Sequence, residues 1–451
     1  MMLDYTSTIF DARQDASNRE RRAAYKRRWS YYHGDQAKPL KVSVGQADDN
    51  VIINLARYIV DKGVAFLFGK DVGFQLEEGA TTPAEETLTE IWRRNRKGTF
   101  LLKLAQLGAI YGHVFVKILP DFYGRGIARL VPIEAEYVDV SWRGDDIESA
   151  YRYTISWTEE GRDGKAVNRR QVIEQDETTG RWSVINRVQR GGGQFIPDPD
   201  NPDIVPWPYK WPPIVDAQNI PCAGVYYGLS DIEDLDEQDA INYVTSAIQR
   251  ILRYHAHPKT WGRGFSAAQV EQGADDLLII QSQSGELRNL EMQSDLASSL
   301  NYLDVLRTEM LRTGRVPDLT TANLSLGATS GFALRLLHGD LLEKTAAKQR
   351  TYGDLLVEIN RRLLELAGYG ENNYTSIIWD DPLPMNEQEQ MTRDGFELDR
   401  GVVSKETVQR RRGLDPETEN ARIAAEGTAE DLRTGNVGAL LIRQFAQGQG
   451  V

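Results

Sequence analysis

The chain has 451 residues, of which 41% are hydrophobic and 26% charged, a composition that excludes a disordered chain or a mini-protein and supplies apolar material for more than one core. A single cysteine excludes an internal disulfide or a thiolate metal cluster and favours a reducing compartment. The 53 lysines and arginines against 66 aspartates and glutamates give a formal net charge of −13, which opposes tight overall binding to a polyanion such as DNA.

The N-terminal region is polar and basic. Residues 11–28 predict a helix, and an aromatic cluster follows at residues 29–32. The helix could contact nucleic acid or face solvent, and both interpretations stay open for its cations, which are Arg19, Arg21, Arg22, Lys26, Arg27 and Arg28. Nothing here resembles an apolar signal segment, and no apolar run approaches the ~20 residues that span a bilayer, so we expect a soluble protein made without an export signal.

Helices and strands alternate through the next hundred residues. The spacing of apolar residues predicts helices at residues 50–68, 83–94 and 99–111. Runs of β-branched and aromatic residues predict strands at 70–76 and 113–119. This part of the chain is therefore of mixed α and β structure.

An all-β region is expected next. Short alternating stretches separated by Gly, Asp and Asn predict an antiparallel meander at residues 135–142, 150–158, 170–175 and 181–188. Seven of the 17 prolines then fall between residues 197 and 213, which excludes a helix or a central strand. We expect an extended arm that crosses a surface.

A long helix is predicted from residue 231 to residue 254, with Ser230 as its N-cap. Arg250 and Arg253 lie near its far end, and acidic residues crowd its first turns, a polarity that matches the helix dipole. The acidic cluster is either a solvated helix terminus or a surface that faces a negative partner; its members are Asp231, Glu233, Asp234, Asp236, Glu237 and Asp239.

A small insertion separates this helix from a second one at residues 296–313. Within it we expect a short helix at 266–272 and a hairpin that joins 276–281 to 286–291 through Ser284-Gly285. The remaining elements are an irregular glycine-rich segment at 314–331, one helix at 332–367 that would be about 54 Å long, a strand at 376–379 and two or three charged helices from 386 to 426.

Motifs for catalysis do not fit the chain. The segment from Gly63 to Lys70 fails as a Walker A loop, because five residues separate its glycines and Asp71 replaces the hydroxyl residue. The glycines at 262–267 do not follow an apolar strand, and His255 and His257 have no third close ligand. We therefore expect no catalytic, cofactor-binding or metal-binding residues and no cofactor.

Several short motifs follow one another in order between residues 29 and 426. They are Trp29-Ser-Tyr-Tyr-His-Gly34, Asn50-Val-Ile-Ile-Asn54 with Phe66-Leu-Phe-Gly-Lys70, Ile214-Val-Asp before Gly228-Leu-Ser-Asp-Ile-Glu-Asp-Leu235, Asp239-Ala-Ile-Asn242, Thr329-Ser-Gly-Phe-Ala-Leu334, Gly401-Val-Val-Ser-Lys-Glu-Thr407 and Leu414-Asp-Pro-Glu417. Each motif is short, but their colinear order resembles the portal proteins of tailed double-stranded DNA bacteriophages. The chain departs from the pattern at Asp239-Ala-Ile-Asn242, where the family usually has tyrosine as the third residue.

The resemblance implies an α+β portal fold with a mixed α/β wing, a two-helix stem, a small α/β clip, a long wing helix and a helical crown. The segments it implies are residues 1–230 for the N-terminal part of the wing, 231–254 and 294–313 for the stem helices, 255–293 for the clip, 314–330 for the tunnel loop, 331–385 for the rest of the wing and 386–451 for the crown.

The resemblance also implies a homo-oligomeric ring, usually of twelve copies, at one capsid vertex. The ring would be the channel for packaging and ejecting double-stranded DNA. Its expected partners are the terminase large subunit, a head-completion or adaptor protein, and the major capsid and scaffolding proteins, with no membrane. The expected location is the virion, after assembly in the host cytoplasm.

Two sets of residues are candidates for the channel. The tunnel loop would contact the DNA backbone loosely through Asn323, Ser325, Leu326, Gly327, Thr329 and Gly331. The acidic residues from Asp231 to Asp239 would form a repulsive lining or wall of the stem. Two other functions remain open: a nucleic-acid-processing enzyme of a phage packaging machine, suggested by basic clusters at 19–28 and 93–97, and a scaffold that joins proteins without a pore.

Overall fold

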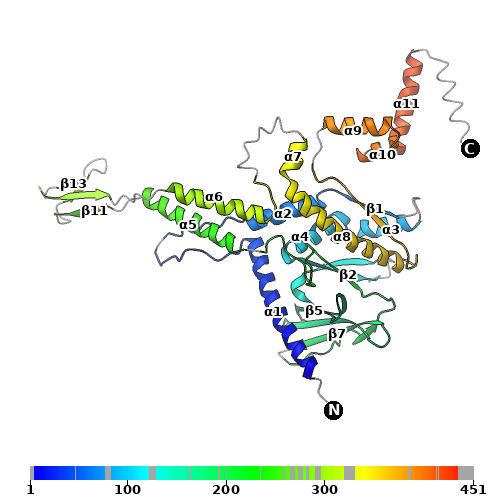
Figure 1. Ribbon diagram of the computed structural model, residues 1–451, viewed down its shortest axis with the longest axis horizontal. Helices are drawn as coiled ribbons and strands as arrows, with labels where there is room; N and C mark the ends of the chain where they lie inside the picture. Colours follow the sequence, from blue (N-terminus) through cyan, green and yellow to red (C-terminus); the bar gives the residue numbers. More distant parts are fainter. Residues whose placement is uncertain are drawn as a thin grey trace, which may run out of the picture. The chain divides into compact units, whose positions relative to one another are not determined.

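The computed structural model divides into two compact units, Met1–Pro382 and Leu383–Val451. Both helices and sheets are present, so the predicted α+β class is confirmed (Figure 1). The residues that the structure describes are 5–45, 47–76, 83–120, 128–161, 164–190, 193–199, 201–233, 235–256, 260–264, 270–272, 278–280, 284–289, 296–318, 331–383, 387–412, 414 and 416–434.

The centre of the first unit is strand β2 (His113–Leu119), which has the predicted bounds. It pairs on one side with β3 (Arg129–Ile133) and on the other with β10 (Ile214–Gln218), antiparallel in both cases. Because successive side chains of a strand point to opposite faces, Phe115 joins one buried apolar cluster while Val114 and Val116 join another. The strand is therefore shared by two cores.

Four helices of the first unit form before the meander. They are α1 (Tyr5–His33), α2 (Leu55–Phe68), α3 (Pro83–Arg94) and α4 (Lys97–Tyr111). Helix α2 begins later than predicted because the side chain of Asn54 accepts the amide hydrogen of Arg57 and caps it there. The preceding residues are extended, and β1 (Val72–Leu76) after α2 pairs with β15 (Thr375–Trp379).

The predicted meander forms a six-stranded antiparallel sheet. Its long strands are β4 (Val138–Arg143), β5 (Asp146–Glu160), β6 (Ala166–Gln175) and β7 (Trp182–Arg190), and the short helix η1 (Ala135–Tyr137) precedes them. Two short strands of the proline-rich segment, β8 (Ile196–Pro197) and β9 (Ile204–Pro206), pair with β7.

The proline-rich segment is held within its own chain. Trp207 and Trp211 are buried, and the indole nitrogen of Trp211 donates to a Glu365 carboxylate oxygen at 2.6 Å. Arg362 donates to the carbonyl oxygen of Pro212 at 2.6 Å. The segment is extended as expected, but the surface on which these residues pack is the chain's own sheet and its long helix.

The long helix near residue 350 is interrupted. It consists of α7 (Gly331–Leu337) and α8 (Gly339–Leu366), so the prediction of one unbroken helix is wrong. His338 lies between them with φ −94° and ψ 13°, and its ring stacks on Phe66 of α2 at 5.5 Å between ring centres. Gly339, a poor helix former, follows the break.

The insertion also differs from its prediction. Strand β11 (Thr260–Arg263) pairs with β14 (Glu286–Asn289), and β12 (Val270–Gln272) pairs with β13 (Leu278–Ile280). The expected hairpin between the last two segments is wrong, since each has an earlier partner. The end of the expected short helix is β12, where β-branched Val270 favours a strand.

The described part of the second unit contains three helices, within the range predicted. They are α9 (Glu387–Asp399), α10 (Lys405–Arg411) and α11 (Pro416–Thr434). The Ser404 hydroxyl caps α10 by accepting the amide hydrogen of Thr407 at 3.2 Å. Within the described ranges of both units, no helix combines the length and the apolar character needed to cross a bilayer.

We predict that Gly108→Ala destabilises the chain by about 1–3 kcal/mol, because the position is too crowded for a side chain. A Cβ on Gly108 would overlap the Tyr352 hydroxyl and approach Val114 Cγ1 to 2.8 Å. The matched control is Gly353→Ala, a helical glycine with open space around it, which should be neutral or stabilising by about 0.5–1 kcal/mol. Urea unfolding measures both, and equal effects would contradict the packing argument.

Candidate functional site

The two predicted stem helices lie side by side (Figure 1). Helix α6 (Leu296–Thr313) has the predicted bounds, whereas α5 (Asp236–Ala256) begins later than residue 231. Ser230 does not cap α5: its hydroxyl donates to the carbonyl oxygens of Ala109 and Ile110 at 2.8 and 2.9 Å. At ~1.5 Å per residue, α5 is about 32 Å long.

One face of α5 binds residues 49–54, which have no regular secondary structure, and Leu55, the first residue of α2; we call residues 49–55 the strap. Gln238, Asn242 and Ser246 are buried, and their side-chain oxygens accept the amide hydrogens of strap residues 55, 53 and 51 at 3.0, 2.9 and 2.9 Å. Gln238 Nε2 also donates to the Ile53 carbonyl oxygen at 2.6 Å. This polar ladder satisfies strap backbone groups that have no sheet partner.

The ladder has a simple geometric origin. Four helical residues advance ~6 Å and two extended residues advance ~6.6 Å, so polar side chains four apart on a helix match alternate amides of an extended chain. The register continues one step further, where Arg250 and Arg253 pair with the buried carboxylate of Asp49 at 3.3 and 2.7 Å. Sequence reasoning missed the ladder, although the four-residue spacing of polar residues from 238 to 250 was a signal for it.

The acidic residues before and within α5 lie against basic residues of α1. Arg27 pairs with Asp236 at 2.6 Å and with Asp239 at 3.1 Å, and Arg28 pairs with Glu233. Two clusters of opposite charge that looked independent in the sequence thus neutralise each other in part. Asp236 keeps 83% of its side chain exposed, so it remains available to a further contact.

Asp231 has a different environment from the rest of its cluster. Its side chain is fully buried, and its carboxylate pairs with Lys348 at 2.7 Å and Lys344 at 3.6 Å. It therefore has no exposed surface with which to line a channel, which corrects its proposed place in the stem wall. Asp234 and the loop candidates Asn323, Ser325, Leu326, Gly327 and Thr329 lie outside the described residues, and Gly331 is the first residue of α7.

Asp231 belongs to a buried network that we call the junction; its members are Asp231, Asn219, Lys344, Lys348 and Tyr352. Asn219 donates to Asp231 at 3.2 Å and accepts from the Tyr352 hydroxyl at 3.1 Å. Lys344 Nζ donates to the carbonyl oxygen of Gly314, just after α6, at 2.6 Å. The junction thus connects the segment entering α5, the end of α6 and the long helix α8.

The junction contains two ammonium groups and one carboxylate. Burial opposes ionisation of Asp231, but attraction from Lys348 and Lys344 outweighs it and holds the pKa of Asp231 below its usual value. Burial lowers the pKa of Lys344 to about 8 despite the Asp231 carboxylate. On α2, Gly63 leaves room for the site, since a Cβ there would lie 2.5 Å from Asp231 Oδ2.

The second basic cluster, at residues 93–97, is also engaged within the chain. Arg93 and Arg94 each pair with Glu90 at 2.6 Å, and Lys97 pairs with Asp71 at 2.9 Å. Within the described part of the chain, no group of three histidine, cysteine or acidic side chains could hold a metal ion.

A comparison with protein-family models supplies the identity of the chain. The model for phage portal protein, SPP1 Gp6-like, matches residues 11–431. The chain belongs to this phage portal family. The family resemblance is therefore confirmed, the chain has a portal or connector role, and the family to which it belongs is structural.

Two solved structures with similarity to this portal chain come from gene transfer agent (GTA) particles. One chain is from the virion of a native GTA particle and another from the neck of an empty GTA particle computed with C6 symmetry. Each is 14% identical with a TM-score of 0.41, over 80% of this chain and 90% of that chain. A comparison with curated protein sequences finds no match.

We predict that Asn242→Ala lowers the free energy of unfolding of the portal chain by about 1–3 kcal/mol. The Ile53 amide would lose its hydrogen-bond acceptor while it stays packed against α5. The exposed α5 residue Gln249 provides a control, and Gln249→Ala should change the free energy of unfolding by less than about 0.5 kcal/mol. Urea unfolding and hydrogen exchange of the Ile53 amide measure the effect. Unchanged exchange at Ile53 in Asn242→Ala would contradict the ladder.

We also predict a pH dependence that arises from Lys344. Its folded-state pKa of about 8 lies below the ~10.4 of an unfolded lysine, so the unfolded chain binds more protons between these values. Stability should therefore gain a contribution as the pH rises from 8 to 9.5. Lys344→Met should lack that contribution, whereas Lys26→Met, at an exposed position, should keep it. Urea midpoints across this range test the sign, and an equal rise in Lys344→Met would contradict it.

Proposed function

We propose that this portal chain forms a closed ring of twelve copies at one capsid vertex, with double-stranded DNA passing through its centre during packaging and ejection. Family membership supports the proposal. The observation that carries it in the structure is the surface of the stem, which exposes apolar side chains on both helices.

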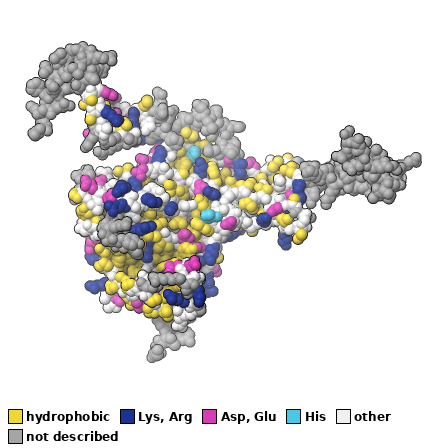
Figure 2. All heavy atoms as spheres, turned by 180° about the vertical axis from the view of Figure 1, so that it is seen from behind, with side chains coloured by type: hydrophobic (Ala, Val, Ile, Leu, Met, Phe, Trp, Pro, Cys, Tyr) yellow, Lys and Arg dark blue, Asp and Glu magenta, His cyan; other side chains and the backbone are white. Residues whose placement is uncertain are grey.

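The exposed apolar residues of the stem are large. Between 47% and 56% of each residue's surface is accessible in the single chain, for Tyr243, Leu252, Leu300, Tyr302 and Val305. Figure 2 shows hydrophobic side chains along this region of the molecule. The strap already covers another face of α5, so these residues are available to a neighbouring copy. A ring of identical subunits needs such contacts between two different faces of the stem.

The net negative charge of the chain is suited to a channel through which DNA slides. Twelve copies at −13 each would carry about −156, which disfavours the cation-to-phosphate contacts that would hold DNA in place. We propose that Glu233, Asp234, Asp236, Glu237 and Asp239 contribute to a repulsive wall. The tunnel loop, with Asn323, Ser325, Leu326, Gly327, Thr329 and Gly331, is proposed to contact the passing backbone loosely.

We further propose that the chain has no enzymatic activity of its own and acts in the virion, after assembly in the host cytoplasm. The terminase large subunit, an adaptor protein and the capsid and scaffolding proteins are its proposed partners. The alternative, a nucleic-acid-processing enzyme, depended on two basic clusters. Arg27, Arg28 and Arg93 from those clusters are paired with carboxylates of the same chain, which weakens that alternative.

We predict a native mass of about 0.6 MDa for the ring, from twelve chains of 50.9 kDa. The double variant Tyr302→Asp with Val305→Asp should remain folded but lose this species, because it places charges in the contact between neighbours. Tyr374→Asp, at a position with similar exposure outside the stem and the proline-rich segment, is the matched control and should keep the ring. Native mass spectrometry and electron microscopy measure the outcome. Dimers or filaments without a closed ring in the wild type would contradict the proposal.

A further inference from the structure

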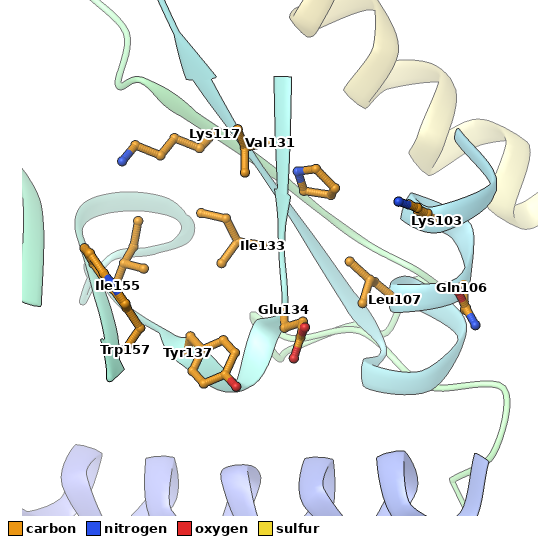
Figure 3. Close-up of a pocket in the computed structure, with 11 residues that line it drawn as sticks. Lys103, Gln106, Leu107, Lys117, Val131, Ile133, Glu134, Tyr137, Ile155 and Trp157 are labelled. Carbon is orange, nitrogen blue, oxygen red and sulfur yellow. The ribbon is translucent and has the colours of Figure 1, made fainter. Parts of the chain in front are cut away.

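Two adjoining hollows on the first unit form what we call the Lys117 groove, because both are lined by Lys117 and Trp157. The first hollow has a volume of about 520 Å³ and an apolar lining that includes Leu107, Ile133 and Ile155. Figure 3 shows Ile133 between Lys117 and Glu134 in this hollow. The second has a volume of about 630 Å³ and is lined by side chains of β6, β7 and the proline-rich segment.

Lys117 has no anionic partner among the residues that the structure describes. Among the described residues, its ammonium group donates only to the side-chain oxygen of Gln171, whose amide nitrogen in turn donates to Asn186. Burial lowers the pKa of Lys117 to about 8, since a neutral amide offsets little of the cost of removing the charge from water. An anion bound in the groove would supply the missing charge-assisted hydrogen bond.

Two further cations of the groove, Lys103 and Arg170, make no ion pair with the carboxylates that the structure describes, whereas Arg169 and Arg187 are paired. Lys103, on the exposed side of α4, lines the first hollow and makes no ion pair within the described ranges. Arg170 lines the second, where its guanidinium lies 4.0 Å from the centre of the Phe195 ring and its Nε is buried without a described hydrogen-bond acceptor.

The carboxylates of the groove do not balance these cations. Glu159 and Asp198 are both paired with Arg169. Glu134 accepts a hydrogen bond from the Tyr111 hydroxyl at 3.4 Å, and burial with the nearby Glu136 raises the pKa of Glu134. The groove therefore has a local excess of positive charge in a chain whose net charge is −13.

We propose that the Lys117 groove is a docking site for an extended acidic peptide of a partner protein. An apolar or aromatic side chain of the peptide occupies the first hollow beside Trp157, and neighbouring carboxylates bind Lys117, Lys103 and Arg170. A peptide fits better than DNA, because a hollow of side-chain size accepts an apolar anchor and Arg169 is already occupied by carboxylates. The inference does not depend on ring formation.

The test uses the full chain and two fluorescein-labelled peptides, Phe-Asp-Glu-Asp-Glu and its neutral counterpart Phe-Asn-Gln-Asn-Gln. Fluorescence anisotropy should detect binding of the acidic peptide only. Lys117→Met should weaken that binding about tenfold, and Lys103→Met should weaken it by a smaller factor. Lys405→Met, which removes an exposed lysine of α10 in the second unit and belongs to neither lining, is the control and should leave binding unchanged.

Several results would overturn the proposal. They are equal binding of the two peptides, no binding of the acidic peptide up to about 1 mM, and an acidic-peptide affinity that is the same in Lys117→Met as in the wild type. A labelled DNA duplex that binds more tightly than the peptide, and with greater dependence on Lys117, would assign the groove to nucleic acid instead. If circular dichroism shows that Lys117→Met is misfolded, the exposed Lys103→Met variant decides, and its unchanged affinity would count against the proposal.

Discussion

The buried carboxylate of Asp231 holds together parts of the chain that are far apart in sequence. It faces two ammonium groups from successive turns of α8, and one of these also donates to the carbonyl oxygen of Gly314. Removing Asp231 would leave two ammonium groups away from water without a counter-charge, which is strongly unfavourable. The segment entering α5 and the chain leaving α6 are therefore fixed to the same helix, so α5 and α6 have a defined attachment to α8.

The strap extends this attachment along α5 by a different chemical means. Where the junction uses charge, the ladder at Gln238, Asn242 and Ser246 uses neutral side chains that bind main-chain amides, and Asp49 ends it with an ion pair to two arginines. Polar groups are thus satisfied within one chain, while large apolar groups of the stem stay exposed. Contacts within one chain therefore position α5 and α6, and their exposed apolar side chains are left for contacts with other copies.

Local patterns predicted most of the secondary structure. Helices α3 and α6 and strand β2 have their predicted bounds. The signals that define them, the spacing of apolar residues and the residues at each end, are all local in the sequence. The predicted start of α5 was wrong because the Ser230 hydroxyl binds carbonyl oxygens about 120 residues away, which no local pattern records. The run of acidic residues near the start of α5 was evident from the sequence. Its ion pairs with α1 and the burial of Asp231 could not be predicted, because they depend on tertiary contacts.

The distance along the chain between the strap and its ladder has a consequence for biosynthesis. The Val51 amide and the Ser246 hydroxyl that accepts its hydrogen are 195 residues apart. At ~5–20 residues per second, a ribosome needs about 10–40 seconds to make the intervening chain, and during that time the strap has no helix to bind. Nascent chains therefore cannot fix α5 against the strap until more than half of the polypeptide has been translated.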